Sequence, residues 1–215
     1  MIRRTVFVAA LFAVVNLHAA GAAPKQAVKG DPEAGKEKTA VCTACHGADG
    51  NSAAATFPKL AGQNARYLEK QMLDIKEGRR NVSLMTGLLN GWSDQDIKNV
   101  AEYYATQVGS VGYAKAELVE KGESIYRSGV AKKGVAACAA CHGAQGEGNS
   151  LAGFPKLGGQ HADYIASQLK AFRTAAEEPE KGRANDGETR IMRDVAASMS
   201  DLDIESVSSY IQGLH

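Results

Sequence analysis

The sequence is short of aromatic residues and almost balanced in charge. Tryptophan, tyrosine and phenylalanine make up 6% of its 215 residues, so large side chains that could fill a core are scarce. Lysine and arginine number 25 against 24 aspartates and glutamates, and no basic stripe suited to a phosphate backbone is present. We therefore expect no nucleic-acid partner, and a core completed by something other than side chains.

Alternating patterns and long apolar runs are also missing. No stretch alternates apolar and polar residues with period 2, so the sequence predicts no sheet. One ten-residue apolar run, residues 6–15, is too short to anchor the chain in a bilayer; it follows Arg3 and Arg4 and precedes small residues. That layout is typical of a secretory signal peptide. We predict that residues 1–23 are a leader and that the mature chain is periplasmic.

Only four cysteines are present, and they form two CxxCH motifs, CTACH at 42–46 and CAACH at 138–142. C-x-x-C-H is the attachment signature of c-type haem, in which two thiols bond one porphyrin edge and the histidine ligates the iron. We therefore expect two covalently bound haem c groups. The four thiols expected to form thioethers are Cys42, Cys45, Cys138 and Cys141. The proximal iron ligands are expected to be His46 and His142.

Three other uses of the cysteines compete with haem. Two disulfides are the ordinary expectation for an exported chain, but the CxxC pairs consume all four thiols. A thioredoxin-like dithiol expects a βαβ setting, and no strand is predicted. A zinc site could combine the two pairs, although structural zinc sites seldom place histidine directly after the second cysteine of both. Haem attachment is favoured, while zinc and dithiol chemistry stay open.

The chain repeats itself once. Residues 42–71 align with residues 138–168 with one insertion, and residues 84–104 align with residues 191–211. Two copies are too few for a solenoid. The repeat therefore predicts a tandem pair of domains, both all-α because only helical periodicity is found.

The glycines between the two halves indicate where the domains join. We place a linker at residues 109–116, where Gly109 and Gly112 interrupt the helical pattern, between domains at 24–108 and 117–215. Each domain is expected to contain an opening, a middle and a closing helix. Both closing helices begin with the S-x-x-D form of a capping box, which is Ser93 with Asp96 and Ser200 with Asp203.

Methionine is scarce, and its place in the repeat decides what occupies the second axial position of each iron. Met85 and Met192 each lie eight residues before the serine that opens the predicted closing helix, and no other pair of methionines holds equivalent positions. Met72 and Met199 are expected in the core. A thioether ligand closes the iron and leaves electron exchange as its natural chemistry. We therefore predict Met85 and Met192 as iron ligands, and an electron-transfer protein rather than an enzyme.

Polar residues near these motifs have more than one interpretation. A carbonyl of the loop holding Pro58 or Pro155 could accept the ring N–H of the proximal histidine. His161, whose counterpart is Asn64, is expected at the surface or beside a haem propionate. Three arginines are equally well explained as propionate partners or as solvated side chains, namely Arg79, Arg80 and Arg183.

Together, several repeated motifs resemble the dihaem cytochrome c4 family: tandem CxxCHG segments, a repeated FPKLxGQ, GRR before the first methionine and two SDxDI helices. The resemblance implies two class I cytochrome c domains related by approximate two-fold symmetry, both haems His/Met-ligated. It also implies a periplasmic electron carrier, often loosely membrane-associated, that feeds a terminal respiratory oxidase. We expect a quinol-oxidising complex to be its donor.

The second half departs from the family pattern in two places. It carries an insert at residues 174–188, and GETR stands where the first half has its arginine run before the methionine. Two alternative functions keep the same fold. The chain could be the dihaem subunit of a periplasmic oxidoreductase, such as a flavocytochrome that oxidises sulfide. It could also be a dihaem peroxidase or sulfur-compound dehydrogenase with one open iron, which the two available methionines disfavour.

Overall fold

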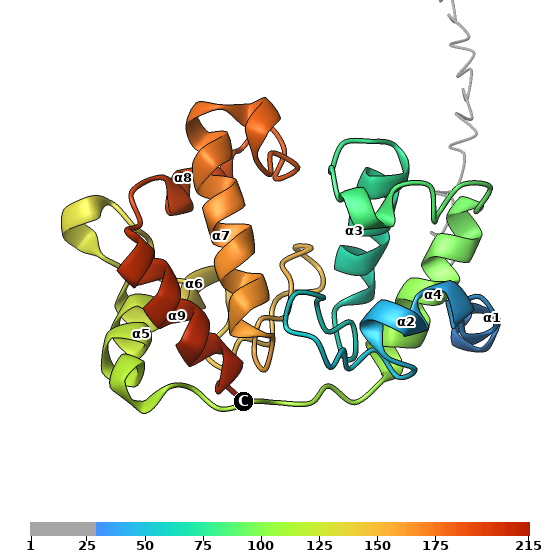
Figure 1. Cartoon of the computed structure of the whole chain (residues 1–215), viewed down its shortest axis with the longest axis horizontal. Helices are drawn as coiled ribbons and strands as arrows, with labels where there is room; N and C mark the ends of the chain where they lie inside the picture. The colour runs from blue at the N-terminus through green and yellow to red at the C-terminus, as the bar shows by residue number, and fades with distance from the viewer. Residues whose placement is uncertain (1–28) are drawn as a thin grey trace, which may run out of the picture.

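The computed structural model describes residues 29–215, and the predicted leader, residues 1–23, lies outside them. The described chain forms two helical bodies that lie side by side, joined by an extended segment along one face (Figure 1). Within residues 29–215 there is no β-strand, only two isolated bridges, Val130 with Val135 and Asn149 with Phe154. The all-α prediction is confirmed.

Each body contains the three expected longer helices and a one-turn helix at the CxxCH motif. The first body comprises α1 (Pro32–Glu37), α2 (Thr43–His46), α3 (Ala65–Lys76) and α4 (Asp94–Thr106), with 3-10 turns at Thr39–Val41 and Ser83–Met85. The second comprises α5 (Ala116–Ser128), α6 (Ala139–His142), α7 (Ala162–Glu177), α8 (Ile191–Ala197) and α9 (Asp201–Gln212), with 3-10 turns at Ala131–Lys133 and Pro179–Lys181.

The closing helices α4 and α9 begin where their capping boxes predict. The Ser93 hydroxyl accepts from the Asp96 N–H at 3.1 Å, and the Asp96 carboxylate accepts from the Ser93 N–H at 2.9 Å. Ser200 and Asp203 repeat the arrangement. Each box satisfies backbone N–H groups that a helix start otherwise leaves without partners.

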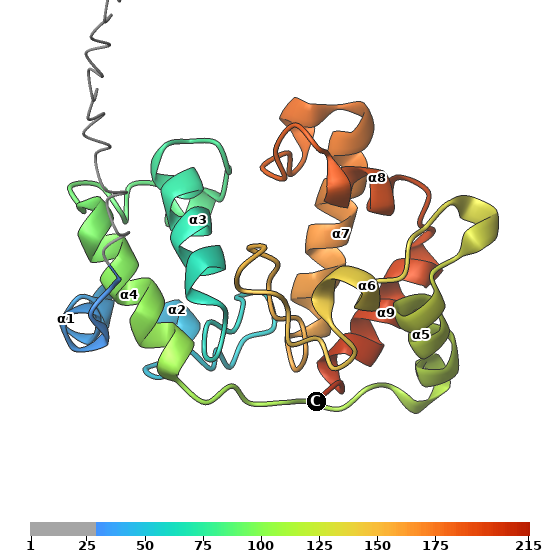
Figure 2. The ribbon, with the colours of Figure 1, turned by 180° about the vertical axis from the view of Figure 1, so that it is seen from behind.

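Opening and closing helices cross at a glycine in both bodies. Figures 1 and 2 show α1 beside α4, and α5 beside α9. A Cβ on Gly35 would lie 2.1 Å from the Asn99 carbonyl oxygen, and one on Gly122 would lie 2.3 Å from the Ser206 carbonyl oxygen. These distances are shorter than van der Waals contact, so only glycine permits the two helix backbones to approach this closely.

The two bodies differ most in the segment before the closing helix. The sequence predicts no helix there, but Met192 lies in α8, whereas Met85 lies in a single 3-10 turn. The physical reason is Gly87, which has φ +81° and ends the turn; Asp194 stands at the equivalent place and permits a helix. The predicted insert extends α7 to Glu177 and adds the turn at Pro179–Lys181.

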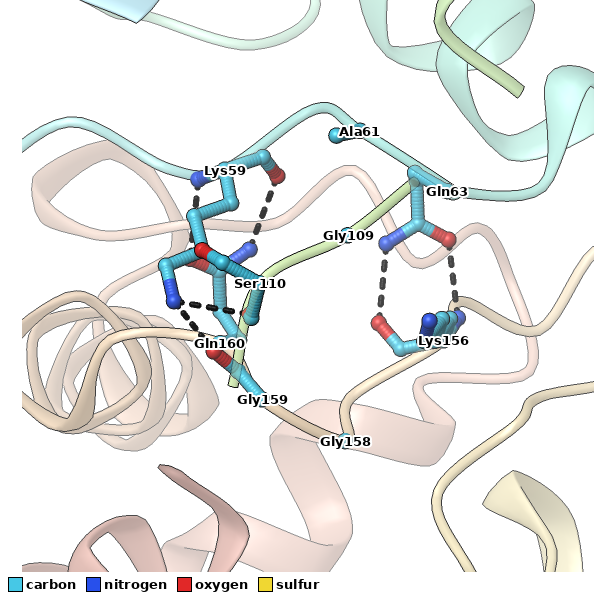
Figure 3. Close-up of a pocket in the computed structure, with 9 residues that line it drawn as sticks. All are labelled: Lys59, Ala61, Gln63, Gly109, Ser110, Lys156, Gly158, Gly159 and Gln160. Carbon is cyan, nitrogen blue, oxygen red and sulfur yellow. Dashed lines mark hydrogen bonds between the residues drawn. The ribbon is translucent and has the colours of Figure 1, made fainter. Parts of the chain in front are cut away.

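The repeated FPKLxGQ loops meet each other across the two bodies (Figure 3). The side chain of Gln160 accepts from the Lys59 N–H at 2.9 Å and donates to the Lys59 carbonyl at 2.9 Å. Gln63 does the same with Lys156, at 2.8 Å for both bonds. We call these four bonds the domain seam. Because the glutamine of each domain bonds to the lysine backbone of the other, the seam has the approximate two-fold symmetry of the repeat.

The linker crosses beside the seam. The Lys59 ammonium donates to the carbonyls of Ser110 and Gly159, both at 2.9 Å, and so ties the linker to both loops. The remaining space is a cavity of about 20 Å³, enough for one water molecule (Figure 3). The Gly112 N–H donates to the Gln212 carbonyl at 3.1 Å, so the linker is held at its far end by α9 as well.

We predict that Gly122→Ala destabilises the protein by about 1–3 kcal/mol, because the added methyl forces α5 away from α9. Chemical denaturation followed by circular dichroism measures this loss. Glu120→Ala, at an exposed position of the same helix, is the control and should change the free energy of unfolding by less than about 0.5 kcal/mol. Equal stabilities for the two variants would contradict the proposed close crossing.

Candidate functional site

Each CxxCH motif forms a single helical turn that places its two thiols and its histidine together. Cys42 and Cys138 are the N-caps of α2 and α6. The His46 N–H donates to the Cys42 carbonyl at 2.9 Å, and the His142 N–H donates to the Cys138 carbonyl at 2.9 Å. This short helix fixes the spacing that two thioether bonds to one porphyrin edge require.

The two histidine rings are buried and held by one proline carbonyl each. His46 Nδ1 lies 2.9 Å from the Pro58 carbonyl oxygen, and His142 Nδ1 lies 3.0 Å from that of Pro155. A carbonyl oxygen can only accept, so Nδ1 carries the hydrogen and the lone pair is on Nε2. The predicted contact with the proline loop is confirmed. It leaves Nε2 of each ring available as a metal ligand.

The environment keeps both rings neutral. Burial lowers the pKa of His46 and of His142, and the hydrogen bond to the proline carbonyl only partly offsets this effect. Phe57 and Phe154 lie against the rings, with centroids 6.2 Å apart in both pairs. A neutral imidazole is the form that binds iron, so the site favours the ligating state at neutral pH.

The thiols are poorly suited to the competing uses of cysteine. All four lie within the described chain and none forms a disulfide. Burial raises the pKa of Cys42, and it raises the pKa of Cys138 to about 11, so neither is the reactive thiolate of a dithiol enzyme. Across residues 29–215 no group of three or more His, Cys, Asp or Glu side chains is arranged to hold a metal ion. A zinc site joining the two pairs therefore has no support.

The predicted methionine ligands occupy different surroundings. Met192, half-buried, packs against the same core cluster as Cys138. Met85 is also half-buried and lines an open cavity of about 330 Å³ between the end of α3 and the loop that follows it. Met72 and Met199 pack into the two cores as expected.

Two arginines meet between the domains with neutral partners only. Arg80 donates to Gln71 in its own domain and to Tyr164 and Gln168 in the other, at 2.9–3.0 Å. Arg183 mirrors it, donating to Gln168, Tyr67 and Gln71 at 2.8–3.1 Å. We call these six residues the arginine cluster. Within the described residues, no carboxylate lies at ion-pair distance from either guanidinium.

The arginine cluster therefore carries uncompensated positive charge. Burial alone would raise the pKa of Tyr67, but the charges of Arg183 and Arg80 outweigh burial and lower it. Half-buried cations of this kind need an anionic partner. Haem propionates would supply that charge, so the donor set fits the cofactor implied by the CxxCH turns.

The arginine cluster bears on two points that the sequence left open. The second domain does not lack its arginine: Arg183, within the insert, takes the place of Arg80, although GETR occupies the aligned position. Arg79 is a different case, since it is about half exposed and pairs with Asp74 at 2.8 Å. Of the two interpretations left open, solvation fits Arg79, and a place beside an anionic partner fits Arg80 and Arg183.

His161, expected at the surface or beside a propionate, is half-buried and contacts the other domain. Its Nε2 atom lies 2.9 Å from the Ser52 carbonyl oxygen of the other domain. Asn64, its counterpart, donates to the Phe154 carbonyl at 2.8 Å in the reverse direction. Both residues directly follow the glutamines of the domain seam. The repetition of FPKLxGQ was the sequence signal for this interface, but the alignment alone does not show that the copies touch.

Asp74 links the middle helix to the second domain. Its carboxylate is buried and accepts hydrogen bonds from Lys70, Arg79 and Asn185, the last from the other domain at 2.7 Å. Burial opposes ionisation, but these three donors outweigh it and lower the pKa of Asp74. The ionised carboxylate therefore stabilises the contact between the domains.

These features define the class of the protein: a tandem c-type cytochrome with one CxxCH site in each domain. A family model described as Cytochrome c matches residues 32–107 and again residues 119–215. Cytochrome c4 of Stutzerimonas stutzeri is 55% identical over 195 residues, covering 86% of this chain and 90% of that protein. The chain belongs to the cytochrome c family and, within it, to the cytochrome c4 proteins.

Further comparisons agree. The crystal structure of reduced recombinant cytochrome c4 from Pseudomonas stutzeri matches with a TM-score of 0.82 at 55% identity, over 86% of this chain and all of that chain. A thiosulfate dehydrogenase electron acceptor of Stutzerimonas stutzeri is 35% identical over 175 residues, 79% of this chain and 76% of that protein. The chain accordingly binds two covalent haem c groups and transfers electrons between redox partners.

Asp74→Asn is predicted to reduce the free energy of unfolding at neutral pH, because the amide cannot replace a carboxylate bound by three donors. The lowered pKa in the folded state means that the carboxylate contributes stability above its unfolded pKa of about 3.9, and loses this contribution as pH falls further. Urea denaturation at pH 7 and pH 3 should show a difference from wild type that shrinks on acidification.

Asp94→Asn is the matched control for Asp74→Asn. Asp94 pairs with Lys76 at 3.5 Å but is 73% exposed, so its loss should cost at most about 1 kcal/mol at either pH. An Asp74→Asn effect that is the same at both pH values would show that the amide is disruptive for steric reasons alone.

Proposed function

We propose that this chain carries electrons in the periplasm from a quinol-oxidising complex to a terminal respiratory oxidase. The observation that supports this proposal most strongly is the equivalence of Met85 and Met192, each half-buried and each eight residues before the serine that caps a closing helix. Two irons closed by thioethers have no position for a substrate, and their natural chemistry is electron exchange.

The proposal assigns each side chain of the two sites a role. Thioether attachment falls to Cys42 and Cys45 in the first domain and to Cys138 and Cys141 in the second. The axial pairs are His46 with Met85, and His142 with Met192. When bound, each haem supplies a one-electron Fe(III)/Fe(II) couple.

The protein's own residues orient the ligands and limit rearrangement. The Pro58 and Pro155 carbonyls hold the histidine rings in one tautomer and raise their basicity as ligands. The arginine cluster would hold the propionates of both haems between the domains. Because the domain seam fixes the two domains against each other, electrons can pass between the sites without a domain rearrangement.

Export and domain boundaries belong to the same proposal. A periplasmic carrier requires removal of a leader at residues 1–23, leaving domains at 24–108 and 117–215 with a linker at 109–116. No helix in the described part of the chain has the length and apolar character needed to cross a membrane. We propose that association with a membrane, where it occurs, is peripheral.

A different donor is the main alternative. The similarity to thiosulfate dehydrogenase electron acceptors favours a sulfur-oxidising dehydrogenase in place of the quinol-oxidising complex. A flavocytochrome that oxidises sulfide is a further candidate donor on chemical grounds. The identity of 55% to cytochrome c4, against 35% to the acceptor, favours the respiratory role.

We expect the exported protein to weigh more than its bare chain by two haem groups, because each CxxCH turn attaches one. Met85→Ala and Met192→Ala should each abolish about half of the red-region sulfur-to-iron absorption band of the oxidised protein. Each should also lower one midpoint potential, within the ~0.8 V range that axial ligands command. Met72→Leu, which changes a core methionine, is the control and should leave both potentials unchanged. Normal potentials in both alanine variants would refute the ligand assignment.

The partners are tested by rapid mixing. The reduced protein should be oxidised by a purified terminal oxidase, and the oxidised protein should be reduced by a quinol-oxidising complex. Each electron transfer should be at least as fast as the turnover of the partner enzyme. Both rates should depend on ionic strength if docking is steered by charge. Reduction by a thiosulfate dehydrogenase but not by the quinol-oxidising complex would establish the alternative donor.

A further inference from the structure

The two domains bury a tyrosine beside the first cysteine of the haem turn, but they take it from different helices. Tyr104 belongs to the closing helix α4, and its aligned counterpart in α9 is Ile211. Tyr126 belongs to the opening helix α5, four residues after the crossing glycine, where the first domain has Thr39. Tyr104 is 1% exposed and Tyr126 is 0% exposed. The hydroxyl therefore comes from the closing helix in the first domain and from the opening helix in the second.

The two hydroxyls differ in their partners. Tyr126 donates to the carbonyl of Gly143, the residue after His142, at 2.7 Å. The Tyr104 hydroxyl, although fully buried, has no hydrogen-bond partner of good geometry among residues 29–215. Buried polar groups of this kind are rare in proteins and call for an explanation.

Cys42 is the polar group placed to explain the Tyr104 hydroxyl. Its side chain packs, half-buried, against the cluster that contains Tyr104. The tyrosine ring packs closely against the Gly50 backbone, where an added Cβ would lie 2.7 Å from its Cδ1 atom. Burial, together with the proximity of Cys42, raises the pKa of Tyr104, so the hydroxyl keeps its hydrogen and remains a donor.

We propose that the Tyr104 hydroxyl donates to the Cys42 sulfur once that sulfur is a thioether, and thereby raises the midpoint potential of the first-domain haem. The hydroxyl hydrogen places partial positive charge beside the porphyrin edge. Oxidised haem carries one more positive charge than reduced haem, so this dipole favours the reduced state in a site of low dielectric. The hydroxyl in the second domain is occupied by the Gly143 carbonyl and exerts no such effect on Cys138.

This inference rests on the proposed attachment of haem to Cys42. Tyr104 is a positioning residue, since it acts on the iron through the cysteine sulfur and the porphyrin. Its consequence for function is directional: the hydroxyl biases an electron shared by the two haems toward the first domain. Tyr126 stabilises the turn after His142 instead, so the two tyrosines have separate roles.

The test is a redox titration of Tyr104→Phe in the full-length haem-loaded protein, with haem-methyl NMR signals used to distinguish the two haems. The first-domain midpoint potential should fall, and the second-domain potential should stay the same. Thermal stability should not decrease, because the lost hydroxyl has no strong partner. Tyr104→Ile, which copies the residue at position 211, is a second variant that removes the hydroxyl and should shift the potential in the same direction.

Two other tyrosines, one beside Tyr104 in α4 and one in the second domain, provide controls. Tyr103→Phe removes a hydroxyl that donates to the Ala48 carbonyl at 3.4 Å, and should leave both potentials unchanged. Tyr126→Phe should lower the thermal stability, since the half-buried Gly143 carbonyl loses its donor. Unchanged potentials in both Tyr104 variants, or equal shifts of both haems, would overturn the inference. Absence of haem on Cys42 in the unsubstituted protein, seen by mass spectrometry, would instead refute the proposed attachment.

Discussion

One loop in each domain carries the hydrogen bonds on which both the haem site and the domain arrangement depend. In the first FPKLxGQ loop, the Pro58 carbonyl fixes the ring of His46, and the Lys59 backbone bonds to Gln160 of the other domain. The side chain of Gln63, at the end of the same loop, bonds to the Lys156 backbone of the other domain. The second copy repeats every step. Because the carbonyl that holds the iron ligand and the residues of the interface lie in one seven-residue segment, a displacement of one domain would pull on the loop that fixes the histidine of the other. This physical coupling explains why the loop, rather than a helix, is the most strongly repeated segment outside the CxxCH turns.

The sequence was sufficient for features that depend on neighbours within about twelve residues. Capping boxes, the CxxCH turn and the contact from histidine to the proline loop are all local, and the structure has them where they were expected. The domain seam was not predictable, since Lys59 and Gln160 are 101 residues apart and the repetition of their motif does not show that the two copies touch. The equivalence of Arg183 and Arg80 was not predictable for a related reason. The position of Arg183 in space is equivalent to that of Arg80, but an insert changes its spacing from the methionine, and alignment by spacing fails there.

Duplication kept the backbone framework and changed the side chains around it. Gly35 and Gly122 preserve the close helix crossing in both copies, because any side chain would collide with a carbonyl. Elsewhere the copies diverge. Asp203 is held by Lys121 and Lys133, whereas its counterpart Asp96 pairs with one lysine of the described residues, Lys38. The second-domain cap thus ties the opening helix and the turn before the haem motif to α9. A common framework with different local charges and hydroxyls is a physical route to two haems of unequal potential within one chain.

The arginine cluster shows how the cofactors and the interface depend on each other. Two guanidiniums that share acceptors across a domain boundary repel each other, and glutamine and tyrosine oxygens offset that repulsion only partly. Such a pair is stable at an interface when anions lie beside it, and haem is the anionic group that this family of proteins binds. The chain alone therefore supplies the hydrogen bonds of the seam, while the cofactors complete its charge balance. Packing of the two domains against each other is, on this argument, more stable once the haems are attached.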